Sequence, residues 1–116
     1  MAFISYALTV NEFLAGKKTC TRRDWSDHHF KQWCKYWDEG KHVHDAWNKV
    51  PYAGGKKIGK FRLTCRPYKE KLADMPVEDL AAEGGMCATF YEFYELIKKG
   101  PEDTVVVIRF LKENPQ

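Results

Sequence analysis

GKKTCTRR, residues 16–23, lies where an expected short helix gives way to an expected strand. Glycine ends a helix at little cost because it adopts the left-handed conformation, and the two lysines after it suit the negative end of the helix dipole. In an extended strand Thr21 and Arg23 share one face, because side chains alternate. Lys18 points away from that face unless the chain turns before Thr19. The stretch therefore predicts a helix-to-strand junction that carries an ammonium group, hydroxyls and guanidinium groups.

The length of 116 residues predicts one domain, residues 1–116, because domains of roughly 100–200 residues are typical. Hydrophobic residues make up 44% of the chain and charged residues 30%, which is enough apolar material for a core. No apolar run approaches the roughly 18–20 residues that span a bilayer. The first residues, MAFISYALTV, lack the features of a secretory signal. We therefore expect a cytoplasmic protein with no membrane partner, and the oligomeric state is left open.

Hydrophobic periodicity and turn residues on either side of residues 16–23 predict an α+β chain. The clearest strand is 57–66, in which Phe61 and Leu63 alternate with polar residues. Residues 104–111 (TVVVIRFL) are apolar almost throughout, as in a central strand buried on both faces. The expected strands are 2–8, 19–23, 41–47, 57–66 and 104–111, and the expected helices lie between Thr9 and Gly16, from Asp24 or Ser26 to Gly40, from Pro76 to Gly84 and from Thr89 to Gly100. This irregular order favours a small mixed β-barrel with peripheral helices.

Two details of this architecture are specific enough to be checked. Thr9 with Glu12, and Thr89 with Glu92, have the spacing of capping boxes at the starts of helices. The alternation within the strands predicts which side chains fill the barrel. We expect Phe61, Leu63, Val105 and Val107 inside it, and the helices that carry Trp33 and Phe93 packed outside.

Charged residues are clustered along the chain, although the net charge is only +3. Residues 16–23 carry four basic and no acidic side chains, residues 56–71 carry seven basic and one acidic, and residues 72–95 carry six acidic and no basic side chains. A basic face is typical of proteins with anionic partners such as RNA. Alternatively, the basic and acidic segments face each other in the fold, and the sequence does not decide between the two.

Several further residues are candidates for binding or chemistry, each with a purely structural alternative. Glu83 ends a helix where the dipole disfavours a carboxylate, so either a cationic partner compensates it or it is simply exposed. Trp25 and Trp47 lie beside polar residues at strand ends, where they could stack on a base or complete the core. Lys56 and Lys57 follow a glycine pair and could contact phosphate, or belong to a plain loop.

Metal and disulfide chemistry are not indicated. The histidines lack a third ligand at a matching spacing, so we expect no metal and no other cofactor. The cysteines form no CxxC pair, and we expect reduced thiols that act as small buried hydrophobes. The residues concerned are His28, His29, His42, His44, Cys20, Cys34, Cys65 and Cys87.

Gly16, Lys18, Thr21 and Arg23 form a G-x-K-x-x-T-x-R pattern that resembles the signature of the ASCH domain family. The resemblance extends in order through the glycine-basic loop, strand 58–64, LADMP with EDL, EGG and the strand 104–111, which together cover most of the chain. It implies a PUA-like barrel with a cleft lined by the signature and by the segment around Glu83.

The resemblance also implies a role near RNA or nucleosides. PUA-like barrels commonly bind RNA, and the family includes a proposed ribonuclease activity. Some small ASCH proteins hydrolyse the acetyl amide of N4-acetylcytidine with a lysine, a threonine and a glutamate, which match Lys18, Thr21 and Glu83. The helical segment 24–41 departs from these compact enzymes, where a shorter loop is expected, and this puts the identity of the substrate in doubt.

We therefore expect a basic cleft that binds RNA or a modified nucleoside. The binding residues are predicted to be Arg22, Arg23, Trp25, Trp47, Lys56 and Lys57. The alternative is an amide hydrolase of the N4-acetylcytidine type, with Lys18, Thr21 and Glu83 as catalytic residues. The retained lysine, threonine and glutamate favour the enzyme, whereas the basic segments and the additional aromatic helix favour the binding protein.

Overall fold

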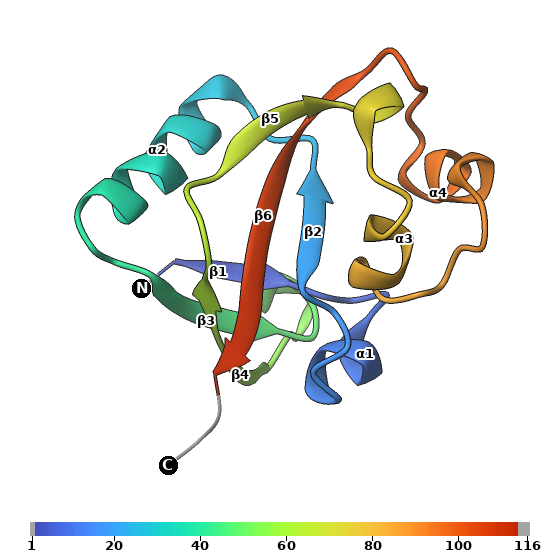
Figure 1. Cartoon of the computed structure of the whole chain (residues 1–116). Helices are drawn as coiled ribbons and strands as arrows, with labels where there is room; N and C mark the ends of the chain where they lie inside the picture. The colour runs from blue at the N-terminus through green and yellow to red at the C-terminus, as the bar shows by residue number, and fades with distance from the viewer. Residues whose placement is uncertain (1, 114–116) are drawn as a thin grey trace.

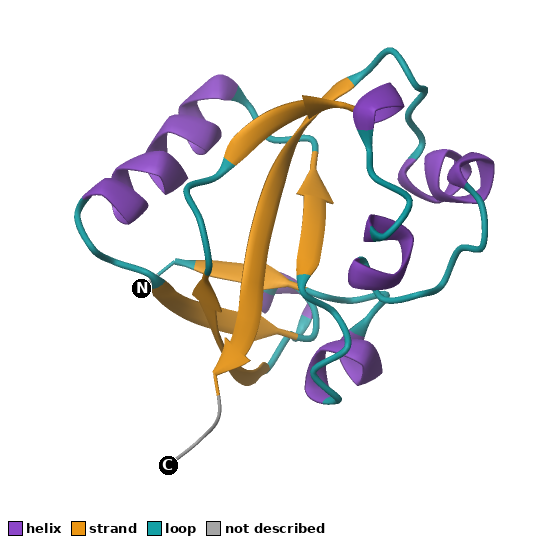
Figure 2. Ribbon diagram, viewed as in Figure 1, coloured by secondary structure: helices purple, strands orange, loops and turns teal. Residues whose placement is uncertain are grey.

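The computed structural model describes residues 2–113 and has α+β architecture (Figures 1 and 2). Its helices and strands follow the order expected from the sequence, with one additional strand. They are β1 (Phe3–Ser5), α1 (Val10–Leu14), β2 (Cys20–Arg23), α2 (Asp27–Asp38), β3 (Val43–Trp47), the 3-10 turn η1 (Pro51–Ala53), β4 (Lys57–Leu63), β5 (Tyr68–Lys71), the 3-10 turn η2 (Leu72–Asp74), α3 (Asp79–Ala82), α4 (Phe90–Ile97) and β6 (Thr104–Glu113).

Strand β6 holds the sheet together because it pairs with three other strands, all antiparallel. It pairs with β5 and β4 along one edge and with β2 along the other. Beyond β4, strand β3 is antiparallel and β1 is parallel, which gives the order β1-β3-β4-β6-β2 with β5 beside β6. Residues 105–108 are all buried, so the prediction of a strand buried on both faces is confirmed.

The sheet is not closed into a barrel. Its end strands are β1 and β2, and within residues 2–113 no backbone pairing joins them. A side chain bridges part of this gap instead, because Arg23 on β2 donates a hydrogen bond from Nη2 to the carbonyl oxygen of Ser5 on β1, at 2.8 Å. The α+β class is therefore confirmed, whereas the PUA-like barrel is not.

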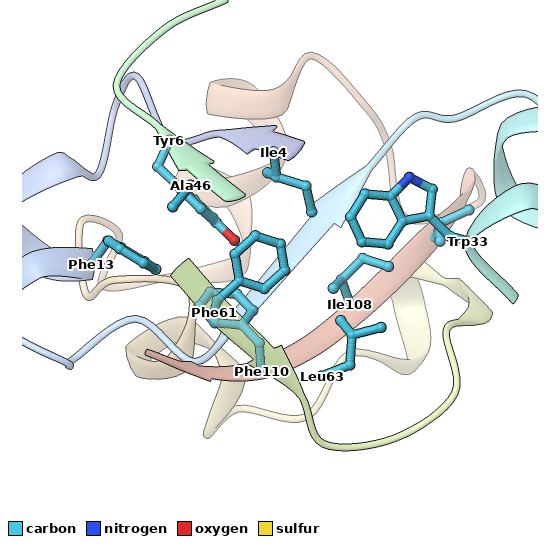
Figure 3. Close-up of a cluster of buried hydrophobic side chains, with 10 residues drawn as sticks. Ile4, Tyr6, Phe13, Trp33, Ala46, Phe61, Leu63, Ile108 and Phe110 are labelled. Atoms are coloured by element: carbon cyan, nitrogen blue, oxygen red, sulfur yellow. The ribbon is translucent and has the colours of Figure 1, made fainter. Parts of the chain in front are cut away.

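One hydrophobic cluster fills the inner face of this curved sheet (Figure 3). Phe61 lies near its centre, with ring centroids 5.2 Å from Phe110 and 5.9 Å from Tyr6. Trp33 enters from α2 and stacks against Phe61 at 6.3 Å. The remaining members come mainly from the strands and from α1: Ile4, Phe13, Ala46, Leu63, Val106 and Ile108.

The predicted interior was right for β4 and wrong for β6. Phe61 and Leu63 belong to the inner cluster, as expected, but the β6 residues there are Val106, Ile108 and Phe110. Val105 packs in a second cluster with Leu72, Met75, Leu80 and Phe93. Val107 alternates with the inner residues and pairs with Arg22 and Tyr68 of the neighbouring strands. In a run that is apolar on both faces, composition does not show which face is the inner one.

The helices cover the two sides of the sheet. Figure 1 shows α2 on one side, and α3 and α4 on the side where the second cluster lies. Ser26 and Thr89 cap α2 and α4, because their hydroxyls accept hydrogen bonds from His29 N and Glu92 N. The capping box predicted at Thr9 is absent, since its side chain makes no capping hydrogen bond and is buried.

The main differences from the predicted elements concern the first strand, the third helix and one strand that was not predicted. The first strand is limited to Phe3–Ser5, and the helix expected from Pro76 to Gly84 contains only Asp79–Ala82. Strand β5 (Tyr68–Lys71) was not predicted, because its sequence YKEK has no hydrophobic alternation. Its pairing with β6 holds it in place, and Lys69 and Lys71, which share one of its faces, are exposed.

Candidate functional site

A cleft of about 210 Å³ opens where the start of β2 meets the chain after β1, the end of α3 and one side of α4. Polar side chains from β2 and α3 form one wall, and Phe93, Leu96 and Ile97 of α4 form an apolar wall. The cleft brings together three residues of the G-x-K-x-x-T-x-R pattern and two other residues that the sequence singled out: Lys18, Thr21 and Arg23, with Arg22 and Glu83.

The chain turns between α1 and β2, at the helix-to-strand junction predicted for residues 16–23. This turn directs the Lys18 side chain into the cleft. Gly16 has a φ of 75°, which ends α1. The backbone N–H groups of Lys17 and Lys18 then both donate to the carbonyl oxygen of Glu12. Thr19 N donates to Ala82 O at 2.8 Å, which ties the junction directly to α3. Lys18 is thereby directed toward the residue that follows Ala82.

Lys18 is a buried lysine whose partner is Glu83. Its side chain is 4% exposed, and Nζ lies 3.3 Å from Glu83 Oε1 and donates to the Glu83 carbonyl oxygen at 2.5 Å. Burial lowers the pKa of Lys18, with Arg23 adding to the effect, while the Glu83 carboxylate opposes it. A lysine in such surroundings loses its proton more readily than an exposed lysine and can act as a base.

Thr21 lies on the inner face of β2 and is held by Arg23. Its hydroxyl oxygen accepts a hydrogen bond of 2.9 Å from Arg23 Nε. Thr21 itself is 3% exposed. The hydroxyl proton of Thr21 takes no part in this hydrogen bond. Within residues 2–113 no hydrogen bond joins the Thr21 hydroxyl to Lys18. In this arrangement Nζ is hydrogen-bonded to Glu83 and not to the Thr21 hydroxyl.

Arg22, which the sequence predicted to bind RNA, has a guanidinium that is buried among carboxylates and not presented to a surface ligand. Side chains alternate along β2, so Arg22 faces the outer side of the sheet, where its side chain is fully buried. Its guanidinium contacts Glu70 at 2.9 Å and Glu83 at 3.0 Å and also binds Asp79. Burial alone lowers the pKa of Arg22, but these partners raise it well above the ordinary value.

Arg109 completes this buried ionic network from β6. It donates to both carboxylate oxygens of Asp79, at 3.0 and 2.6 Å, and to the Tyr68 hydroxyl at 2.9 Å. Sequence reasoning missed Arg109, although it is the one charged residue within the apolar run 104–111. The network answers the question of charge for residues 16–23, because Lys18 and Arg22 face acidic residues of segment 72–95. Of its charged side chains, segment 56–71 contributes only its single acidic residue, Glu70, to the network.

The other predicted binding residues do not line the cleft. Trp25 stacks on His29 at 4.0 Å and lines a separate groove. Trp47 packs against Phe3 at the end of β3, with ring centroids 5.8 Å apart. Lys57 forms an exposed ion pair with Asp45, with 3.1 Å between Nζ and Oδ1. Lys56 is exposed in the loop before β4, where its backbone N–H is bound by Asn48.

Tyr6 and Cys20 also lie close to the site, and sequence reasoning missed both. Tyr6 lines the cleft, and its hydroxyl is buried without a hydrogen-bond partner within residues 2–113. In Figure 3 this hydroxyl is directed toward Phe61. Cys20, beneath the ionic network, is buried, and burial together with Glu83 raises its pKa to about 12. It is therefore a neutral thiol at pH 7 and not a nucleophile.

The described part of the chain holds no metal-binding cluster of three or more His, Cys, Asp or Glu residues. Cys20 and Cys34 are buried thiols, while Cys65 and Cys87 are partly exposed. Among residues 2–113 no helix is long and apolar enough to cross a membrane.

Comparison with known proteins gives no relative. No protein-family model, curated protein or solved structure matches the chain.

Proposed function

We propose that the chain is an ASCH-type amide hydrolase that removes a small acyl group from a modified nucleoside such as N4-acetylcytidine. The observation that carries the proposal is the convergence of Lys18, Thr21, Arg23 and Glu83 in one cleft of about 210 Å³. The pattern that suggested the family is thus also a spatial cluster. The open sheet is compatible with a PUA-like topology in which Arg23, rather than backbone pairing, links the end strands.

In the proposed reaction Thr21 is the nucleophile and Lys18 the base. Lys18, as the free amine, accepts the hydroxyl proton while Thr21 Oγ1 forms a bond to the amide carbon. The carbon–nitrogen bond then breaks, and Glu83 relays the proton from Lys18 to the leaving amine. Water attacks the acyl carbon in the second half, the bond to Oγ1 breaks, and the acid and the Thr21 hydroxyl are released. Arg23 positions Oγ1 throughout and transfers no proton.

Binding of long RNA across a basic face is the less favoured alternative. Arg22 is buried among carboxylates and Lys18 is paired with Glu83, so neither offers charge to a surface ligand. Lys56 and Lys57 lie on another part of the chain. A ligand the size of a nucleoside therefore fits the cleft better than a polymer backbone does, and such a substrate favours a cytoplasmic location.

The direct test is release of acetate and cytidine from N4-acetylcytidine, followed by chromatography. We expect Thr21→Val to abolish turnover and Thr21→Ser to retain part of it, because only serine keeps a hydroxyl. Thr64→Val on the exposed end beyond β4 is the matched control and should turn over at the wild-type rate. Mass spectrometry of wild-type protein quenched during turnover should show one acetyl group on Thr21. Absence of release by folded wild-type protein would refute the proposal.

A further inference from the structure

A second groove adjoins the cleft and has a different character. It encloses about 460 Å³, and aromatic side chains form part of its lining: Phe3, Trp25 and Tyr36, which are at least partly exposed, and the buried Trp33. Three of these four lie in the helical segment 24–41: Trp33 and Tyr36 on α2, and Trp25 two positions before its first residue. The function proposed above makes no use of this groove.

Ser5 and Arg23 line both the cleft and the groove. Arg23 therefore lies at their common wall, where its hydrogen bond to Ser5 O spans the gap between β1 and β2. A ligand that occupies both spaces must pass beside this guanidinium. The two spaces are thus neighbours that share a wall containing a cation.

Arg23 differs from the other arginine at the site because its charge is not neutralised. Arg22 has three carboxylate partners, whereas within residues 2–113 no carboxylate forms a salt bridge with Arg23. Its two hydrogen bonds go to the uncharged acceptors Thr21 Oγ1 and Ser5 O, which leaves Nη1 without a partner in the described chain. A guanidinium in this state is a ready partner for a phosphate, which it binds through paired N–H groups.

We propose that the cleft and the groove together bind two consecutive nucleotides of single-stranded RNA. The modified nucleoside occupies the cleft, its linking phosphate contacts Arg23, and the neighbouring base stacks in the aromatic groove. This rests on the proposed function for the identity of the nucleoside. Aromatic side chains accept any base, since every base has a flat π face, and the bases must be unpaired to enter. Gln32, which also lines the groove, offers an amide to the base edge.

The test compares ligands that differ in one group at a time, bound to the Thr21→Val protein and measured by calorimetry. The ligands are N4-acetylcytidine, its 5′- and 3′-monophosphates, dinucleotides with adenosine on either side, the same dinucleotides with an abasic neighbour, and those with a neutral methylphosphonate linkage. We expect one dinucleotide to bind about 5- to 100-fold more tightly than the corresponding monophosphate. The abasic and methylphosphonate forms should each lose most of this gain.

Two variants test whether the groove provides the gain in affinity of the dinucleotide over the monophosphate. Trp25→Ala should lose the contribution of the neighbouring base, whereas Trp37→Phe, on the same helix but outside both spaces, should keep it. Equal affinity for nucleoside, monophosphate and both dinucleotides would overturn the inference even if acetate is released. If no acetylated ligand is cleaved but an unmodified dinucleotide still gains from its neighbour, the proposed reaction fails and the two-nucleotide site stands.

Discussion

Lys18 Nζ lies 3.3 Å from Glu83 Oε1, although the two residues are 65 positions apart in the sequence. The pair joins the turn before β2 to the end of α3, and the Glu83 carboxylate opposes the effect of burial on the pKa of Lys18. Burial lowers the pKa of Lys18, and the carboxylate raises it. The pH at which Lys18 becomes a free amine therefore depends on Glu83.

We expect kcat to rise with pH through a midpoint below the ordinary lysine value of 10.5, because the free amine is the active form. Glu83→Gln should lower kcat and shift the midpoint of the remaining activity to lower pH, since the group that raises the pKa of Lys18 is gone. Lys17→Ala removes an exposed neighbouring lysine and should leave the profile unchanged. A midpoint that stays fixed in Glu83→Gln would show that Lys18 is not the titrating base.

Arg23 is expected to act as a positioning residue for Thr21. Lysine keeps the charge at this position but cannot donate to both Thr21 and Ser5 in the fixed geometry of a guanidinium. Arg23→Lys should therefore lower kcat by about 10- to 100-fold in steady-state assays with N4-acetylcytidine. Arg62→Lys, on the exposed face of β4, serves as the control and should have wild-type kinetics. Full activity of Arg23→Lys would contradict this role.

Removing Arg22 should destabilise the fold strongly. Arg22→Met leaves the carboxylates of Glu70, Asp79 and Glu83 without their common partner, and loss of one member of a buried ionic network costs about 3–5 kcal/mol. Urea denaturation should show this loss in the free energy of unfolding. The matched control is Arg66→Met, whose ion pair with Asp38 is exposed and should matter little. Equal stability of the two variants would refute a structural role for the network.

His44 is expected to make stability depend on pH. It is buried between Trp33 and Tyr36, with Nε2 bound to Lys41 O at 2.8 Å, and burial lowers its pKa below the ordinary value of 6.5. Below pH 6.5 the unfolded chain binds a proton at His44 that the folded chain does not. The free energy of unfolding should therefore fall as pH decreases below 6.5.

The matched comparison for His44 is the variant His44→Phe, which keeps an aromatic ring and removes the titrating group. Urea denaturation at several pH values between 5 and 8 should show a weaker pH dependence for this variant than for the wild type. Nearby Asp45 and His42 are retained in both proteins, so their contributions cancel in the difference. An identical slope in the two proteins would rule out His44 as the cause.

Sequence reasoning succeeded where one physical signal dominates. The alternation in β4 predicted that Phe61 and Leu63 are inner residues. The position of Glu83 at a helix end left two alternatives, a cationic partner or simple exposure, and the structure has the first, with Lys18 and Arg22 as partners. It failed where two signals overlap. The run 104–111 is apolar on both faces, so the inner face of β6 was assigned to Val105 and Val107 instead of their neighbours.

The ionic network was beyond sequence reasoning for a different reason. Charged residues are normally exposed, so Arg22 was read as a surface residue. Only the pairing of β2, β5 and β6 reveals that Glu70 and Arg109 lie beside it. Strand β5 was missed for a similar reason, because its charged sequence YKEK forms a strand by pairing with β6 and has no hydrophobic alternation of its own.

Strand β2 pairs only with β6 among the described strands, and β6 is synthesised after every strand with which it pairs. Until residues 104–113 have left the ribosome, Thr21 and Arg23 have no sheet to hold them. Contacts between segments so distant in sequence also form slowly, because a long loop must close first. Under the proposed function, reactivity toward a nucleoside is therefore expected only once β6 has been synthesised.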